Sequence, residues 1–450
     1  MMDGRPSHPR AGTVEPWGSA GRWHRFIFPE EIERNFLHSL TLLHPRAVIV
    51  SVMHCDLECR YSAPPRTGGL AFYSYPWINP YSAFVGGAQH QPPSWRGRFL
   101  ALETDLSIRD LRAGASRGKL GRLLRALKGA AGKEDIVLLN MTCLPDKLGD
   151  CAHAQRLLAA ANLGAQVLTN DPAVDQAVPP IVRYVRSLLE RAVRRGKRRR
   201  PGSVNLAGFP RCREKEELKA HLGEAGVVVN ADIVPDIDLG ALETFAEAER
   251  TVLFPEEHMQ GLFRHLFRGL PIETLSPPAP FGMEGSWRWL EAVAASVGRG
   301  AALARHRGAW WRKEEAGWLQ NLERAKAVNA GFVGTAADLR RFADPLCAAG
   351  VPVFAVLDEA GIGVETFLLD EGFRTPGELQ DLLRKSASRI VYSDVFFDDR
   401  LTACGKIPFS IASFRMGPEG ATRTLESLLG ASGTPFYRTY AAYLHEPREA

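Results

Sequence analysis

The chain has 450 residues, of which 45% are hydrophobic and 24% charged, and its formal net charge is +5. These values are typical of a soluble globular chain, and the length suggests about three domains. No uninterrupted apolar run approaches the ~20 residues that a membrane-spanning helix needs, so no membrane span is expected.

The amino-terminal segment and the cysteines indicate the cellular compartment of the chain. Residues 1–22 are rich in Gly, Pro, Ser and Arg and lack the apolar centre of a secretory signal. We predict a disordered leader and a cytoplasmic chain. The chain has seven cysteines. Because this number is odd and the chain is long, the cysteines do not suggest a disulfide framework. Four of them lie from Cys55 to Cys151, and this clustering hints at a metal.

The first predicted α/β unit spans residues 23–190. Charged and apolar residues alternate at helical spacing over 26–43, and the β-branched run 46–52 is typical of a buried strand. The stretch 61–95 is rich in Gly, Pro, Tyr and Trp, which predicts a functional loop or a surface that covers a partner. The elements expected after it are helices at 120–131 and 152–162 and strands at 135–139 and 166–169.

A basic run, residues 191–202, follows the first unit and supplies much of the net charge. A nucleic-acid surface would need aromatic or further basic residues nearby, and the sequence has none there. The run is therefore interpreted as a solvated basic linker, and no nucleic-acid partner is expected.

The second unit, 203–304, and the third, 327–445, alternate short strands with helices of about ten residues. A charged connector, 305–326, separates them. The expected fold is α/β, with three successive Rossmann-like doubly wound units that have parallel sheets. The predicted strands are 203–209, 227–230, 250–254, 327–334, 351–357 and 389–394, and the predicted helices are 214–224, 239–246, 258–267, 287–297, 337–349, 375–386 and 418–429.

The most informative candidate site is the turn Thr142-Cys143-Leu144-Pro145, which follows the predicted strand 135–139. Open α/β sheets hold their ligands at the carboxyl ends of parallel strands. A thiolate at such a position can bind a metal or act as a nucleophile. The alternative is that Cys143 is a small buried hydrophobic residue.

A second pair of thiols, Cys55 and Cys59, follows the predicted strand 46–52. A Cys-x-x-x-Cys pair at a strand end can hold two corners of an iron–sulfur cluster, because iron clusters need soft thiolate ligands. The same pair is equally compatible with free thiols that pack the loop. Cys151 is an additional candidate ligand if the turn between it and Cys143 folds back.

Other polar residues have simpler structural explanations beside their functional ones. His54 adjoins Cys55 and could bind a metal or carry protons, but an isolated histidine is more often a polar group that finds a hydrogen-bond partner. Three further cysteines are Cys212 in a strand-to-helix turn, Cys347 on the apolar side of a helix and Cys404 in a loop. His258 and His265 lie on one face of a predicted helix. The acids Asp394, Asp398 and Asp399 follow a predicted strand, and they could position a substrate or cap a turn.

Several motifs resemble the nitrogenase component 1 family, which includes nitrogenase catalytic subunits, dark-operative protochlorophyllide and chlorophyllide reductases and cofactor-assembly scaffolds. Residues 142–150 resemble the family's Thr-Cys-x-Pro-[Asp/Glu]-x-[Ile/Leu]-Gly-Asp turn. Further similar segments are 103–111 with Gly114 and Lys119-Leu120, 204–208 with its Val-Asn-Leu-x-Gly pattern, 217–219 with Asn230, and 271–290.

The resemblance implies an oxidoreductase subunit of a two-component, ATP-driven system. A separate P-loop iron–sulfur ATPase would pass single electrons to an iron–sulfur cluster, of the 4Fe–4S type or larger, held where two homologous component-1 chains meet as a homo- or heterodimer or tetramer. Cys55, Cys59 and Cys143 would bind this cofactor, with Cys151 as a further metal ligand. The sequence has no Gly-x-x-x-x-Gly-Lys-[Ser/Thr], so ATP hydrolysis would belong to the partner.

The chain departs from the family at one motif, since the His-Gly-Pro-x-Gly-Cys turn that carries another cluster cysteine is absent. Its absence keeps open a non-catalytic scaffold or assembly subunit, or a cluster completed by another chain. A third alternative is an unrelated Rossmann-like transferase with incidental thiols, although no Gly-x-Gly-x-x-Gly follows any predicted strand. Dinitrogen, a tetrapyrrole and a sulfur compound remain open as substrates, with dinitrogen the least expected.

Overall fold

The computed structural model describes most of the chain between residues 41 and 434, in segments with gaps between them. The described residues are 41–43, 47–54, 99–104, 106–112, 116–129, 131–141, 151–170, 178, 180–196, 198–209, 212–234, 236–255, 259–334, 339–358, 371–373, 376–393, 401, 404–410 and 414–434. They fall into two units by their internal contacts. The larger unit holds the described residues between Ile27 and Glu314 together with Met416–Gly420, and the smaller unit holds the rest. The domain boundaries expected from the sequence stay a prediction.

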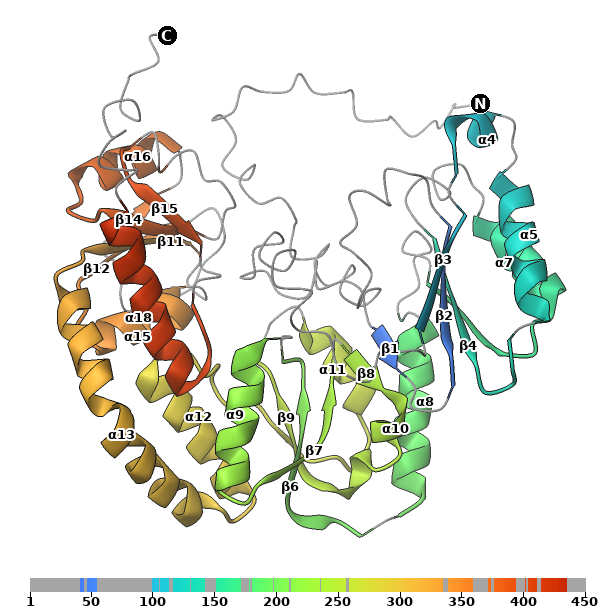
Figure 1. Cartoon of the computed structure of the whole chain (residues 1–450), viewed down its shortest axis with the longest axis horizontal. Helices are drawn as coiled ribbons and strands as arrows, with labels where there is room; N and C mark the ends of the chain where they lie inside the picture. The colour runs from blue at the N-terminus through green and yellow to red at the C-terminus, as the bar shows by residue number, and fades with distance from the viewer. Residues whose placement is uncertain are drawn as a thin grey trace, which may run out of the picture. The chain divides into compact units, whose positions relative to one another are not determined.

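The first sheet of the larger unit is entirely parallel and has the order β3-β2-β4-β5. Its strands are β2 (Ile49–His54), β3 (Phe99–Glu103), β4 (Ile136–Met141) and β5 (Gln166–Asn170), and the helices that follow them are α4 (Ile108–Arg112), α5 (Ser116–Lys128), α7 (Cys151–Ala161) and α8 (Pro180–Arg194). Figure 1 shows α5 and α7 side by side next to this sheet.

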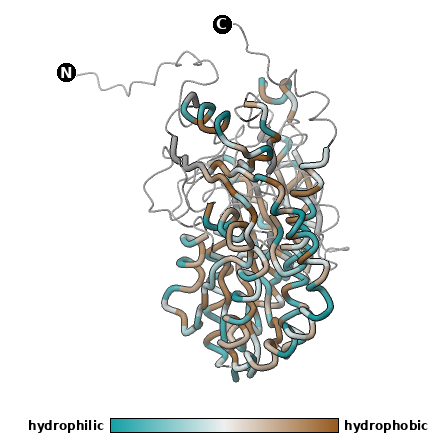
Figure 2. The backbone as a smooth tube through the Cα atoms, turned by 90° about the vertical axis from the view of Figure 1, so that its left-hand side faces the viewer, coloured by the Kyte–Doolittle hydropathy of each residue, from teal (hydrophilic) through white to brown (hydrophobic). Residues whose placement is uncertain are grey.

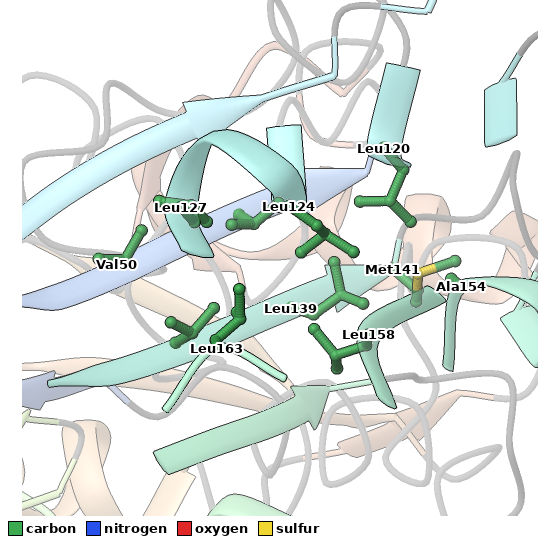
Figure 3. Packing of buried hydrophobic residues seen from close by; sticks show 11 residues of the cluster. Val50, Leu120, Leu124, Leu127, Leu139, Met141, Ala154, Leu158 and Leu163 are labelled. Carbon is green, nitrogen blue, oxygen red and sulfur yellow. The ribbon is translucent and has the colours of Figure 1, made fainter. Parts of the chain in front are cut away.

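Helices α5 and α7 cover one face of the first sheet because each has an apolar stripe. On α5 the stripe is Leu120, Leu124 and Leu127, at the spacing of one helix face. These leucines pack on strand residues such as Val137 and Leu139, and Figure 3 shows their side chains pointing into the same core. Full burial of one leucine stabilises the fold by about 2 kcal/mol. This core fixes the positions of β2 and β4.

The second sheet of the larger unit has the order β1-β8-β7-β6-β9-β10 and is parallel except where β7 meets β8. Its strands are β1 (Thr41–Leu43), β6 (Arg200–Ala207), β7 (Val228–Ile233), β8 (Asp236–Asp238), β9 (Ala248–Leu253) and β10 (Thr274–Leu275). Its helices are α9 (Arg213–Glu224), α10 (Leu239–Leu242), η3 (Phe245–Glu247), α11 (Gln260–Phe267) and α12 (Met283–Ser296). Helix α8 packs against α10 and α11, and α9 packs against α12.

The smaller unit contains the third parallel sheet, in the order β13-β12-β11-β14-β15. Its elements are β11 (Ala330–Gly334), η5 (Leu339–Ala343), α15 (Asp344–Ala348), β12 (Val353–Asp358), β13 (Glu371–Phe373), α16 (Pro376–Lys385), β14 (Ile390–Ser393) and β15 (Ile407–Ser410). The long helix α13 (Gly300–Lys326) and the last helix α18 (Gly417–Gly433) contribute residues to both units. Parallel-dominated sheets that alternate with helices confirm the predicted fold class.

Some local predictions need correction. Residues 41–43, expected at the end of a helix, form strand β1 because they pair in parallel with β8. Much of the basic run is regular structure, since α8 continues to Arg194 and β6 begins at Arg200. Ion pairs join Arg199 to Glu273 and Arg200 to Glu247. The run is therefore partly neutralised by acids that flank strands β9 and β10.

The described helices carry both polar and apolar residues. Figure 2 shows teal and brown stretches alternating along the chain, as amphipathic elements around a core require. Among the residues that the structure describes, no helix is both long and apolar enough to span a membrane.

Candidate functional site

The order of the first sheet creates a switch point between β2 and β4. The chain leaves β2 toward β3 on one side, and after β3 it returns past β2 to form β4 on the other side. The connections after β2 and β4 therefore leave the sheet in opposite directions. In open α/β sheets, ligands bind at the carboxyl ends of the two strands where this reversal happens.

The carboxyl ends of these two strands lie next to each other. His54 ends β2, Met141 ends β4, and the two residues are direct partners in the parallel ladder. In the sequence Cys55 comes directly after His54, and Cys143 comes two residues after Met141. The candidate ligands Cys55, Cys59 and Cys143 themselves lie outside the described residues. Cys151 is the first residue of α7, the helix that follows β4.

A buried hydrogen bond fixes the end of β2 against the end of β3. The Nδ1 atom of His54 lies 3.0 Å from the hydroxyl oxygen of Thr104, and the backbone amide of Thr104 donates to the carbonyl of Met53 at 3.0 Å. His54 is 1% exposed and Thr104 is 5% exposed. The residue before Cys55 is therefore held in one orientation by its neighbouring strand.

The connection after β3 is held by a capping arrangement at α4. The amide of Ser107 donates to the Asp110 carboxylate at 2.8 Å, and the Ser107 hydroxyl accepts from the Asp110 amide at 3.2 Å. Lys119 of α5 forms an ion pair with the same carboxylate at 2.7 Å. The hydrogen bonds from Lys119 and Ser107 hold the pKa of Asp110 well below its usual range. This contact links α4 to α5 beside the switch point.

The switch point of the second sheet lies between β6 and β9 and is filled by aromatic side chains. Phe209 follows β6 and Phe254 follows β9, and both are fully buried. Their rings pack edge to face with centroids 5.1 Å apart, and the ring of Trp289 of α12 packs on Phe209 with centroids 5.5 Å apart. The residues that follow these two strands are therefore part of the hydrophobic core.

Three cysteines have described side chains, Cys212, Cys347 and Cys404, and none of the three lies in a group of potential metal ligands. Cys212 precedes α9, where burial and the carboxylate of Glu214 raise the pKa of its thiol to about 12. A thiol with so high a pKa is a poor nucleophile at neutral pH. Cys404 is buried in the apolar cluster of the third sheet and Cys347 is partly buried on α15. Within the described ranges, no group of three or more His, Cys, Asp or Glu side chains is arranged to hold a metal ion.

The other sequence candidates divide between exposed and undescribed positions. His265 is exposed on α11, whereas His258 lies outside the described residues. The third sheet has its own switch point between β11 and β14. Asp394 directly follows β14, and together with Asp398 and Asp399 it lies outside the described part of the chain.

One polar cluster was missed in the sequence. His221 of α9 contacts His306 of α13 and Glu419 of α18, although 85 and 198 positions separate these partners from it. No local spacing encodes such a contact. The only sequence signal was that each residue stands in a predicted or charged helical segment.

The comparisons with known proteins agree with this architecture. The sequence model of the family described as nitrogenase component 1 type oxidoreductase matches residues 104–402, more than half of the chain. No curated protein sequence matches. Two solved structures of nitrogenase Cp1, at pH 5 and at pH 6.5, share the fold, with 13% and 12% identity and TM-scores of 0.57 and 0.54. Each comparison covers 88% of this chain, and 86% and 87% of the nitrogenase chains.

These matches set aside the alternative of an unrelated transferase. The chain belongs to the nitrogenase component 1 type oxidoreductase family.

Proposed function

We propose that the chain is a component-1-like subunit of an ATP-dependent, two-component iron–sulfur reductase. It would bind an iron–sulfur cluster, of the 4Fe–4S type or larger, through Cys55, Cys59 and Cys143, with Cys151 as a further ligand. The observation that supports this proposal best is the switch point between β2 and β4, because candidate thiols follow both strands directly.

Chain connectivity makes the donor set suitable for a cluster. Adjacent Cα atoms are about 3.8 Å apart. Cys55 is therefore one such step from His54, and Cys143 is at most two such steps from Met141. Those two residues are ladder partners. Thiolates are the ligands that iron–sulfur clusters prefer. A ligand set drawn from two adjacent strand ends therefore fits such a group.

The described residues would prepare this site rather than perform the redox step. The bound cluster would supply one-electron storage. The His54–Thr104 hydrogen bond holds the end of β2, and the Asp110–Lys119 ion pair holds the connection after β3. Buried leucines beneath the strand ends exclude water from one face of the sheet.

The partners follow from the same proposal. A separate P-loop iron–sulfur ATPase would deliver electrons, because the sequence has no nucleotide-binding loop of that kind. A second component-1 chain, identical or homologous, would complete the assembly. We place this system in the cytoplasm, where thiols stay reduced.

The metal content of anaerobically purified protein tests the proposal. We expect iron, acid-labile sulfide, charge-transfer absorption in the visible range and an electron paramagnetic resonance signal after reduction. Cys55→Ser, Cys59→Ser and Cys143→Ser should each lower the iron content, whereas the control Cys347→Ser should not. Wild-type protein without iron or visible absorption would contradict the cluster assignment.

The absent His-Gly-Pro-x-Gly-Cys turn favours a second candidate, a scaffold or assembly subunit that carries a cluster without turnover. The two functions differ in electron transfer. A reductase subunit should be reduced by its P-loop partner only when ATP is hydrolysed. A scaffold should instead transfer its cluster to an apo-acceptor protein in the absence of ATP.

A further inference from the structure

Three tryptophans of the larger unit form a path of contacting rings. Trp287 lies on α12, and Trp310 and Trp311 are neighbours on α13. The ring centroids of Trp287 and Trp310 are 5.4 Å apart, and those of Trp310 and Trp311 are 5.9 Å apart. Both distances are ordinary for aromatic rings in contact. Trp287 is fully buried and the other two are partly exposed, so the path joins the core of the unit to its surface.

The middle ring of this path is hydrogen-bonded to a carboxylate. The indole nitrogen of Trp310 donates to Oε1 of Glu419, in the first turn of α18, at 2.9 Å. The Nε2 atom of the buried His221 lies 3.0 Å from each oxygen of the same carboxylate. Burial would raise the pKa of Glu419, but the hydrogen bonds from His221 and Trp310 lower it to about 2. At neutral pH the indole of Trp310 therefore faces a negative charge that is held in place.

Trp287, the buried end of the path, has the opposite surroundings. The guanidinium carbon of Arg307 lies over its ring, 5.6 Å from the centroid. Ion pairs with Glu284 and Glu291 hold this guanidinium there and screen part of its charge. The indole nitrogen of Trp287 is buried and has no hydrogen-bond partner among the residues that the structure describes. A positive charge on this ring would face a guanidinium and would have no acceptor for its N–H.

This difference determines which ring loses an electron more easily. One-electron oxidation places a positive charge on an indole and makes its N–H a stronger donor. Inside a protein, a charge is stable only beside an opposite charge or a hydrogen-bonding partner. The carboxylate of Glu419 provides both to Trp310, and the attraction is stronger where protein replaces water. An electron hole that reaches either Trp287 or Trp310 therefore localises on Trp310.

We propose that Trp310 is a redox-active residue, which gives one electron through Trp311 to an oxidised metal complex at the surface and is held as an indole radical cation by Glu419. No bond breaks in this step, since one electron leaves the ring, the metal complex gains it, and the proton stays on the indole nitrogen. A thiolate reductant in solution returns the electron and becomes a thiyl radical. This role goes beyond the proposed cluster function, and neither depends on the other.

Laser-flash oxidation of the full-length protein tests the assignment. A ruthenium tris-bipyridine complex in solution, oxidised by the flash in the presence of a sacrificial electron acceptor, is the one-electron oxidant. The difference between wild type and Trp310→Phe isolates the signal of this residue. We expect the optical and electron paramagnetic resonance spectra of an indole radical cation, whose coupling to the N–H proton is lost after equilibration in D2O. A difference spectrum of a neutral, deprotonated indole radical would overturn the proposal.

Two further variants test the carboxylate and the choice of ring. Glu419→Gln keeps an acceptor for the indole N–H but removes the charge, and should lower the yield of the cation about tenfold. Trp318→Phe removes another buried indole of α13 and is the matched control, which should leave the yield unchanged. A cation signal that survives in Trp310→Phe, or that is equally strong in Glu419→Gln and wild type, would refute the assignment.

Isotope labelling of the wild-type protein gives a test that does not depend on the folding of a variant. Ring-deuterated tryptophan should narrow the resonance of the radical, whereas ring-deuterated tyrosine should not. A resonance that narrows only with labelled tyrosine would contradict the proposal. Because the radical is detected on tryptophan and not on iron, failure of this proposal and failure of the cluster proposal are distinguishable.

Discussion

The Nδ1 atom of His54 lies 3.0 Å from the hydroxyl oxygen of Thr104, and this side-chain hydrogen bond links the carboxyl ends of two adjacent parallel strands. Both residues are almost fully buried. The bond stands directly before the first candidate cluster cysteine. It therefore couples the geometry of the proposed site to the stability of the first sheet.

Replacement of Thr104 by Val tests this coupling. Valine fills the same space but leaves the buried imidazole without this hydroxyl partner, which should lower the free energy of unfolding by about 1–2 kcal/mol. Urea denaturation measures the change. Thr274→Val, at an exposed position of β10, is the control and should have little effect. Equal stabilities of Thr104→Val and the wild type would show that the bond is not formed in solution.

A second prediction concerns Gly208, which follows β6. Its φ is +88°, and an added Cβ would lie 2.7 Å from the Phe263 ring and 3.0 Å from the sulfur of Met259. Gly208→Ala should therefore destabilise the protein by about 3 kcal/mol, combining backbone strain with overpacking.

Gly269 provides the matched control for Gly208. Its φ is also positive, at +74°, but an added Cβ would meet no atom within 4 Å. Gly269→Ala should cost only the backbone strain, about 1 kcal/mol. Melting temperatures of the two variants separate the contributions, and similar losses in both would contradict the close approach at Gly208.

A third prediction concerns the amide pair of β6 and β7, in which Asn205 is buried and Asn230 is partly buried. Asn230 donates to the side-chain oxygen of Asn205 at 2.9 Å, and Asn205 donates to the carbonyl of Phe245 at 2.9 Å and to Thr251 at 3.2 Å. Asn205→Leu leaves several buried polar groups unpaired and should cost about 2–3 kcal/mol. In a double-mutant cycle with Asn230→Leu, the two changes should couple by about 1 kcal/mol. Additive effects would mean that the amides act separately.

The Asn205 network and Gly208 explain why one sequence motif was recognisable. Residues 204–208 and Asn230 stood out because they resemble a family pattern, and the structure shows that Asn230 donates to Asn205 and that Gly208 has a positive φ. Helices such as α5 were predictable for a similar local reason, since the spacing of their leucines encodes one buried face. Local pattern and local structure coincide in these segments.

Other features depend on contacts that no local pattern contains. Strand β1 is only three residues long, and pairing with β8, almost two hundred positions later, makes it a strand. The contact of His221 with Glu419 likewise exists only after the sheets and helices have assembled. The switch point between β2 and β4 required the strand order, which the sequence did not specify.

A fourth prediction concerns the capping contact of α4. Asp110→Ala removes the acceptor of Ser107 and the partner of Lys119, so the amides of α4 should exchange faster with solvent. Because the folded-state pKa of Asp110 is lowered, the contribution is present above the ordinary aspartate pKa of 3.8 and is lost as the pH falls below it. High salt should also weaken it, since the pair is near the surface.

The surface pair Asp381–Arg384 on α16 supplies the comparison for Asp110. The Nη1 atom of Arg384 lies 3.4 Å from the Oδ1 atom of Asp381, and both side chains are more than half exposed. Asp381→Ala should leave the exchange of α16 nearly unchanged, because exposed pairs contribute little. An effect as large as that of Asp110→Ala would refute the special role of the α4 cap.

The fifth prediction concerns acid unfolding and Glu419. Its folded-state pKa is lowered to about 2 against an ordinary value of 4.5, so its contribution to stability is present above pH 4.5 and is lost as the pH falls from 4.5 toward 2. Glu419→Gln should reduce the stability at neutral pH and flatten the decline in this window. Urea midpoints measured across the pH range give both effects. Glu426→Gln, at an exposed position of the same helix, is the matched control. If the stability of Glu419→Gln changed with pH in parallel with that of the wild type, the carboxylate would not be held by His221 and Trp310.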